Sequence, residues 1–77
     1  MTIARILAKK DLIELLHHLG PDEFTPESVL ARSIGKDAAL VRPLLRELGR
    51  EGVAFSVRRK VGGHQFDVWK ISKGALP

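Results

Sequence analysis

The sequence predicts an α+β fold in which the helices come first and a β-hairpin follows them. Apolar residues recur with a helical period up to about residue 50, and glycines and prolines divide that part into separate helices. From Val53 onward the pattern changes to the alternation typical of strands. Because 77 residues leave room for one small core, we expect residues 1–77 to form a single domain.

Composition excludes several classes of protein. The chain has no cysteine, so disulfides and thiolate metal sites are excluded. Its longest apolar runs are only three or four residues, and charged residues interrupt the N-terminal apolar pattern, so we expect neither a membrane span nor a signal peptide. These features favour an intracellular protein of the cytoplasm or nucleoid, or of the nucleus in a eukaryote.

The positive charge is concentrated in the second half of the chain. Residues 1–31 carry three basic and five acidic groups, whereas residues 32–77 carry ten basic and four acidic groups. This asymmetry is typical of a protein with a polyanionic partner. An ordinary basic protein without such a partner is the alternative at this point.

The first segment, Ile3–Leu19, has the apolar spacing of a helix. Asp11 and Glu14 also fit a capping box, so the segment is either one helix or an irregular piece followed by a helix. Gly20 and Pro21 end it, since glycine suits the left-handed C-terminal position and proline cannot continue the helix.

A short second helix follows a polar loop. We expect Phe24 to fill the core, within a strand of one or two residues if it forms one, and Thr25 to cap a helix whose first residue is Pro26. Gly35 ends this helix. We expect its buried face to comprise Val29, Leu30 and Ile34.

The third helix is expected to run from an N-cap at Asp37 to about Arg50. Its apolar stripe has the spacing i, i+3, i+4, i+7 and comprises Val41, Leu44, Leu45 and Leu48. Pro43 conflicts with this helix, because it removes a hydrogen bond to Ala39 at a cost of about 3 kcal/mol in a regular interior. The helix is therefore either kinked, which we prefer, or regular only from about Arg42.

Residues 53–72 are expected to form a hairpin with a glycine turn. A three-residue loop, residues 61–63, would pair Phe55 with Trp69 and gather the bulky residues on one buried face, and we prefer that register. The alternative two-residue loop would place Phe55 opposite Lys70. Under the preferred register Trp69 anchors the core, and two apolar side chains point outward: Phe66 and Val68.

The order of helix, link, helix, helix and hairpin resembles the winged helix-turn-helix DNA-binding family. Its most specific part is the run L-A-R-S-I-G-K-D-A-A-L-V-R-P-L-L-R-E-L-G-R-E-G-V, residues 30–53. The residues at family positions are Leu30, Ala31, Gly35, Asp37, Val41, Leu45, Leu48, Glu51, Gly52 and Val53. The resemblance covers about residues 11–72, and leaves residues 1–10 as an N-terminal extension or dimerisation segment and residues 73–77 as a tail.

The resemblance implies double-stranded DNA binding by a small transcriptional regulator or an architectural protein. Residues 36–51 would lie in the major groove, and the wing at residues 58–65 would contact the DNA backbone. Arg42 and Arg46 are the expected base contacts, because an arginine fork can donate two hydrogen bonds to guanine. The other expected DNA contacts are Lys36, Ala38, Ala39, Arg50, Arg58, Arg59, Lys60, His64 and Gln65.

Three alternatives remain at this stage. The arginines of the third helix could form a solvated face paired with Glu47 and Glu51. The winged helix could instead bind a protein, through the Phe66/Val68 surface or the N-terminal segment, or it could bind RNA.

A Z-form reading is a further alternative. I-G-K-D, E-G-V and W-K-I are similar to the Z-form nucleic-acid-binding domains of RNA-editing deaminases. However, Arg42 and Arg46 stand where those domains have asparagine and tyrosine, and Asp67 and Val68 replace prolines before Trp69.

We expect no catalytic residue, metal ligand, cofactor or small-molecule substrate. The sequence lacks a nucleophile with a base partner, and adjacent His17 and His18 on a helix point about 100° apart. A minimal winged helix does not need the apolar side chains of Ile3, Ile6 and Leu7 for its core. A homodimer that covers these side chains is therefore an additional possibility.

Overall fold

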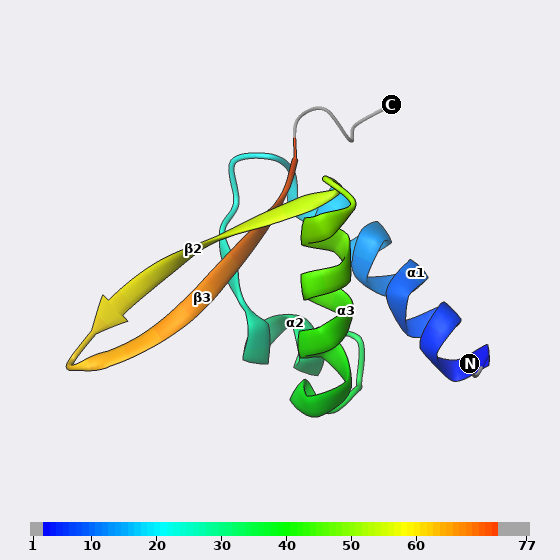
Figure 1. Ribbon diagram of the computed structural model, residues 1–77, viewed down its shortest axis with the longest axis horizontal. Coiled ribbons are helices and arrows are strands. Elements are labelled where there is room, and N and C mark those ends of the chain that lie inside the picture. The colour runs from blue at the N-terminus through cyan, green and yellow to red at the C-terminus, as the bar shows by residue number, and fades with distance from the viewer. Residues whose placement is uncertain (1–2, 73–77) are drawn as a thin grey trace.

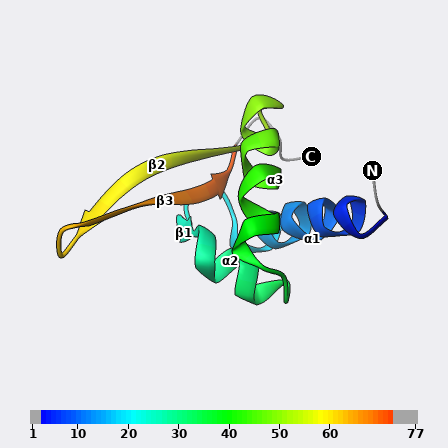
Figure 2. The ribbon, with the colours of Figure 1, turned by 60° about the horizontal axis from the view of Figure 1, so that its bottom comes forward.

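The computed structural model describes residues 3–72, in which three helices pack against a three-stranded antiparallel sheet (Figure 1). The elements are α1 (Ile3–Leu19), β1 (Thr25–Pro26), α2 (Glu27–Ser33), α3 (Ala38–Arg50), β2 (Ala54–Val61) and β3 (His64–Ile71). Helix α3 lies between α1 and the long β2–β3 hairpin, as two views show (Figures 1 and 2). The expected α+β fold is confirmed, while the expected tail at residues 73–77 lies outside the described residues.

Helix α1 is one continuous helix, so the alternative of a restart near Asp11 is wrong. Its core face carries Ala8, Leu12 and Leu16, each at most 1% exposed. These residues pack against the stripe of α3, whose four members Val41, Leu44, Leu45 and Leu48 are fully buried, as predicted. The stripe fixes which way α3 turns and therefore which residues it exposes.

The link before α2 differs from the prediction. Thr25 and Pro26 form strand β1, paired with Trp69 and Val68, and α2 begins one residue later than expected at Glu27. Proline is tolerated here because β1 is at the edge of the sheet, where its missing N–H breaks no ladder bond. Thr25 is buried in this strand, and the residue at the N-cap of α2 is Pro26, which makes no side-chain cap bond, so the expected Thr25 cap is wrong.

Two apolar residues near this link are not where the sequence suggested. Phe24 does not join the main core but lies against Phe55, with ring centroids 6.0 Å apart and the rings nearly perpendicular. Val29 is exposed rather than buried, because α2 is short and turns Leu30 and Ala31 toward the core instead. The prediction for Leu30 is confirmed.

Pro43 lies inside a single helix. Residues on both sides of it belong to α3, so the alternative that the regular part begins near Arg42 is wrong, and any kink leaves the helix unbroken. Pro43 and Ala39 are both exposed, so the carbonyl that loses its partner lies on the solvent side of the helix. Asp37 precedes the helix as expected, although its side chain makes no cap bond.

The hairpin has the two-residue loop, so the predicted three-residue register is wrong. Phe55 is opposite Lys70, and Ser56 is opposite Trp69. Gly62 and Gly63 both have positive φ, 57° and 84°, as a type I′ turn requires. Phe24 covers part of the second sheet face by packing against Phe55, so the bulky residues of the hairpin need not share one face.

The register gives the hairpin two different faces. We call the side that carries Ser56, Arg58 and Trp69 the inner face, since Trp69 belongs to the core cluster beside α3. The opposite, outer face carries Phe55 and Val57. Val68 is also on the outer face but is buried, contrary to prediction, whereas Phe66 is exposed as predicted.

Candidate nucleic-acid interface

A groove of about 710 Å³ lies between the exposed side of α3 and the hairpin. Its lining comprises Pro26, Glu27, Ser28, Ala38, Arg42, Arg46, Arg58, Gln65, Phe66 and Asp67. Helix α3, the start of α2 and both strands of the hairpin contribute, so the tertiary fold assembles this surface from distant parts of the chain.

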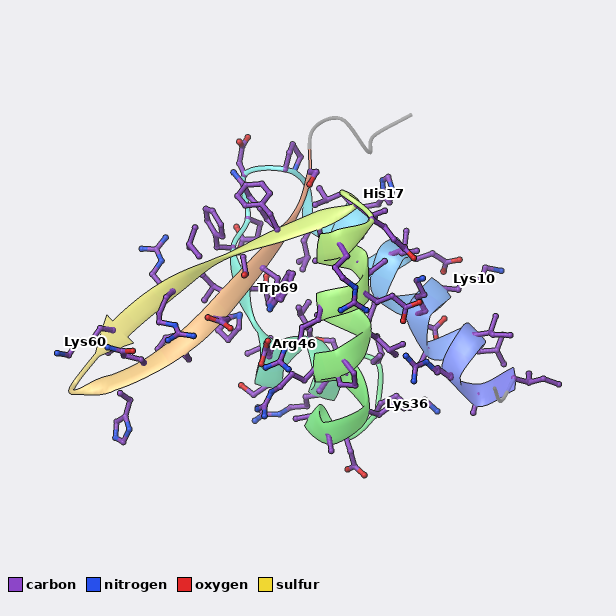
Figure 3. The ribbon with its side chains drawn as sticks, viewed as in Figure 1. Lys10, His17, Lys36, Arg46, Lys60 and Trp69 are labelled. Carbon is purple, nitrogen blue, oxygen red and sulfur yellow. The ribbon has the colours of Figure 1, made fainter. Side chains whose placement is uncertain are left out.

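The α3 wall of the groove carries two arginines one turn apart. Arg46 makes no hydrogen bond or ion pair within residues 3–72, and it lies on the side of α3 that faces the hairpin (Figure 3). Arg42 is tied instead: its Nε donates to Oε1 of Glu27 at 3.2 Å. The two predicted base contacts therefore line the same side of the groove, but Arg42 is paired with a carboxylate and Arg46 is unpaired within the described residues.

Glu27 is a functional candidate that the sequence did not suggest. Its second oxygen, Oε2, accepts a hydrogen bond from Nε1 of Trp69 at 2.9 Å, so one carboxylate joins Arg42 to Trp69. Trp69 is 5% exposed and packs in the core, as predicted. Nothing in the spacing of Glu27 indicates this contact, because Trp69 is distant in sequence and the register decides where its indole points.

The three consecutive basic residues of the hairpin do not act as a unit. Arg58 points to the inner face and its Nε donates to Oδ1 of Asp67, its cross-strand neighbour, at 3.4 Å. Arg59 points to the outer face, where its guanidinium lies 5.5 Å from the ring centroid of Phe24. Alternation along the strand separates them, and Lys60 returns to the inner side near the hairpin tip (Figure 3).

The structure brings together five of the residues predicted from the sequence and leaves the others outside the groove. The five are Ala38, Arg42, Arg46, Arg58 and Gln65. The residues outside the groove are all exposed: Lys36, Ala39, Arg50, Arg59, Lys60 and His64. Lys36 lies near the start of α3 and Lys60 near the far end of the hairpin, so this outer set is spread along the same molecule (Figure 3).

Glu47 in α3 and Glu51 directly after it serve a different purpose from the one suggested by sequence. Glu47 accepts hydrogen bonds from Lys9 at 3.0 Å and from Arg5 at 3.1 Å, and Glu51 accepts one from Lys9 at 2.8 Å. They therefore join α3 to α1 rather than neutralising the arginine row. The hydrogen bonds from Lys9, and then from Arg5, lower the pKa of Glu47, while those to Glu51 and Glu47 raise the pKa of Lys9.

The groove carries both positively and negatively charged side chains. Three arginines line it, together with the carboxylates of Glu27 and Asp67. Each carboxylate is bonded to one arginine, so Arg46 supplies the positive charge that remains unpaired in the groove. Such a surface leaves the guanidinium of Arg46 available to an anion and offers oriented polar groups elsewhere. Across residues 3–72, no group of three or more histidine, aspartate or glutamate side chains could hold a metal ion.

Helix α2, a turn through Gly35, helix α3 with one polar side exposed, and a hairpin beside it define a winged helix-turn-helix fold. This confirms the fold inferred by resemblance. The structure of the Zalpha domain from Carassius auratus PKZ in complex with Z-DNA is similar to this chain, with TM-score 0.70 and 24% identity over 88% of this chain and 97% of that chain.

A second similar structure comes from Methanosarcina mazei Go1 and is described as a possible transcriptional regulator. It has TM-score 0.69 and 21% identity, and the match covers 96% of this chain but 59% of that one. No protein-family model matches the sequence, and no curated protein matches it. These likenesses establish the fold. No helix in the described part of the chain is long and apolar enough to cross a membrane.

Proposed function

We propose that this protein binds double-stranded DNA as a small transcriptional regulator or architectural protein, with α3 in the major groove and the hairpin as a wing on the backbone. The observation that carries the proposal is the groove beside α3, where the unpaired Arg46 faces the hairpin. A major groove about 12 Å wide admits a helix and displays the acceptors that arginine recognises. This role needs no catalytic residue. It implies a protein of the cytoplasm or nucleoid, or of the nucleus in a eukaryote.

The exposed basic residues outside the groove support the same arrangement. Lys36 lies near the start of α3 and Lys60 near the tip of the wing (Figure 3), and Arg50 is the last residue of α3. All three are exposed and make no ion pair among residues 3–72. Lysine and arginine in such positions suit phosphates, which give affinity and orientation but no sequence information. The two similar structures, one in complex with Z-DNA and one described as a possible transcriptional regulator, are consistent with a nucleic-acid partner.

A salt titration with matched variants tests the proposal. Duplex affinity should fall steeply with salt, since each phosphate contact releases counterions. Arg46→Ala should relax sequence preference, whereas Lys60→Ala should weaken all duplexes alike and reduce the salt slope by about one unit. Binding that stays weak on every duplex and is unaffected by either substitution would contradict the proposal. Competition with Z-form DNA and with RNA identifies the preferred nucleic acid.

We also propose that two copies associate through the N-terminal half of α1. Ile3, Ile6 and Leu7 are all more than half exposed, and beside them lies a groove of about 530 Å³ lined by Ile6, Ile13 and the stems of basic residues. Apolar exposure of this kind on one helix is typical of an interface. The groove and its ion pairs involve three basic and three acidic side chains: Arg5, Lys9, Lys10, Glu14, Glu47 and Glu51.

This balance of charge favours a second copy as the occupant, because two such surfaces do not repel each other. The surface lies on the side of α3 away from the wing, so both recognition helices would stay free (Figure 2). A two-fold dimer would then present two copies of α3 to one duplex.

A protein-binding role is the second candidate, and the outer face of the wing favours it. Phe55 and Val57 are exposed there, and Nζ of Lys70 lies 5.0 Å from the ring centroid of Phe55. Because Val68 is buried, Val68→Ser would test folding rather than binding. Phe55→Ser is the better test: unchanged binding of every protein partner would exclude this face.

A further inference from the structure

We propose that Glu27 determines what Arg42 contacts on DNA. Its carboxylate holds the Arg42 guanidinium in position to bind a base edge and disfavours contact with DNA phosphates. This inference rests on the proposed DNA binding and names a specificity-determining residue for it. Glu27 would act through Arg42 without needing to contact DNA, so it is a positioning residue.

The carboxylate of Glu27 is held in place from the core side. Its Oε2 accepts the indole N–H of Trp69 at 2.9 Å, and Trp69 is a buried member of the core cluster. Glu27 is also the first residue of α2, and its side chain is 16% exposed. A group held by a rigid helix and by a buried ring has little freedom to follow a ligand.

Arg42 is held from that fixed point. Its Nε donates to Oε1 of Glu27 at 3.2 Å, while its side chain remains 56% exposed. A guanidinium has N–H donors on several edges, so occupying Nε leaves the two terminal amino groups for another partner. Two parallel donors in a fixed plane match O6 and N7 of guanine. The geometry therefore presents a fork suited to a base edge.

The same carboxylate disfavours a phosphate at Arg42. A phosphate contacting the guanidinium would lie within a few ångströms of the negative charge of Glu27, and like charges at that distance repel strongly where water is partly excluded. A neutral guanine edge meets no such repulsion. Arg46, one turn further along α3, has no carboxylate partner in the described part of the chain, so it remains open to either kind of contact.

A purely structural role for this ion pair is a weaker explanation. An exposed arginine paired with a carboxylate contributes little to stability. The bond to Trp69 can be made by an amide oxygen as well as by a carboxylate, so stability alone does not require a charge at position 27. The charge at position 27 determines which groups can approach Arg42, and the experiment measures that effect.

Glu27→Gln is the decisive variant, because its amide oxygen can keep the bond to Trp69 while its amide N–H₂ cannot accept from Arg42. The preferred duplex is first selected from random sequences with the wild-type protein. Affinities for that duplex and for a scrambled one are then measured from low to high salt. Glu23→Gln, at an exposed acid outside the groove, removes the same charge and is the matched control.

In the Glu27→Gln protein, Arg42 has lost its carboxylate partner and should contact DNA phosphates. For Glu27→Gln we expect affinity for scrambled duplex to rise about threefold at low salt, and the slope of log K against log salt to steepen by about 0.9. Preference for the selected duplex should fall about fivefold. In the wild-type background, Arg42→Ala should lower that preference and leave the salt slope unchanged. Glu23→Gln should leave both the preference and the salt slope unchanged.

Two checks separate this result from unfolding. Thermal melting should show that Glu27→Gln is folded, and the fluorescence of Trp69, the sole tryptophan, reports whether its environment is retained. If a folded Glu27→Gln protein keeps the wild-type salt slope and preference, the inference is overturned while DNA binding stands. If the wild-type protein binds no duplex, the proposed function falls and this inference falls with it.

Discussion

At Gly49 the backbone of α3 lies against the ring of Trp69. A Cβ at this position would lie 3.4 Å from Cζ3 and 3.5 Å from Cη2 of that ring, which is ordinary van der Waals contact. Glycine is the less favourable helix residue, so we expect Gly49→Ala to stabilise the protein by about 0.5–1 kcal/mol. Urea unfolding monitored by circular dichroism measures the change.

The control for this prediction is a glycine that the fold needs. Gly52 has φ of 76° just after α3, and an alanine there is strained although the space around it is open. Gly52→Ala should therefore destabilise the protein. If both substitutions destabilise it, the contact between Gly49 and Trp69 is tighter than the fold implies.

The ion pairs of Glu47 make the stability of the folded protein depend on pH in the acidic range. Because Lys9 and Arg5 lower its pKa from the ordinary value of 4.5, the stability it contributes is present above that value and is lost as pH falls through the lowered pKa. Glu47→Gln should flatten the decline in melting temperature between neutral and strongly acidic pH. Glu23→Gln, at an exposed acid outside the ion pairs described for residues 3–72, should leave the decline unchanged.

Lys9 gives the opposite dependence at alkaline pH. Its pKa is raised from 10.5 by the hydrogen bonds to Glu51 and Glu47, so its contribution is complete below that value and is lost as pH rises through the raised pKa. Lys9→Met should lower the melting temperature at neutral pH and remove part of the alkaline decline. A variant that melts like wild type across the range would show that α1 docks without this pair.

Among the elements, α3 carries a proline at a cost. The helix continues through Pro43 with the hydrogen bond to Ala39 missing on its exposed side. We expect Pro43→Ala to stabilise the protein by about 1–3 kcal/mol, measured by thermal and urea unfolding. If stability falls instead, the proline holds α3 in a form that its packing requires.

The wing shows where local pattern and tertiary structure diverge. Two strands and a glycine turn were predictable from residues 53–72, since alternation and Gly62-Gly63 are local features. The register was not, because β1 and Phe24 cover parts of the sheet that a hairpin considered alone leaves open. One residue of slip then moved Phe55 away from Trp69.

At the scale of the whole molecule, the dimer proposal predicts a melting temperature that rises with protein concentration, because association stabilises the folded state by mass action. Ile6→Asp should abolish that rise and give a monomer in sedimentation equilibrium. Val61→Asp, at an exposed apolar residue near the wing tip, is the matched control and should leave association intact. A wild-type protein that stays monomeric at high concentration contradicts the proposal.

The sequence by itself determined the helices, the buried stripe of α3, the position of the hairpin and the basic character of the second half of the chain. These follow from periodicity, turn residues and composition, which are properties of neighbouring residues. Only the tertiary structure decided the register of the wing, the pairing of Arg58 with Asp67 and the link from Arg42 through Glu27 to Trp69. Those features join residues that are not neighbours in the chain, and their partners are chosen by packing on both faces of the sheet, which no local pattern records.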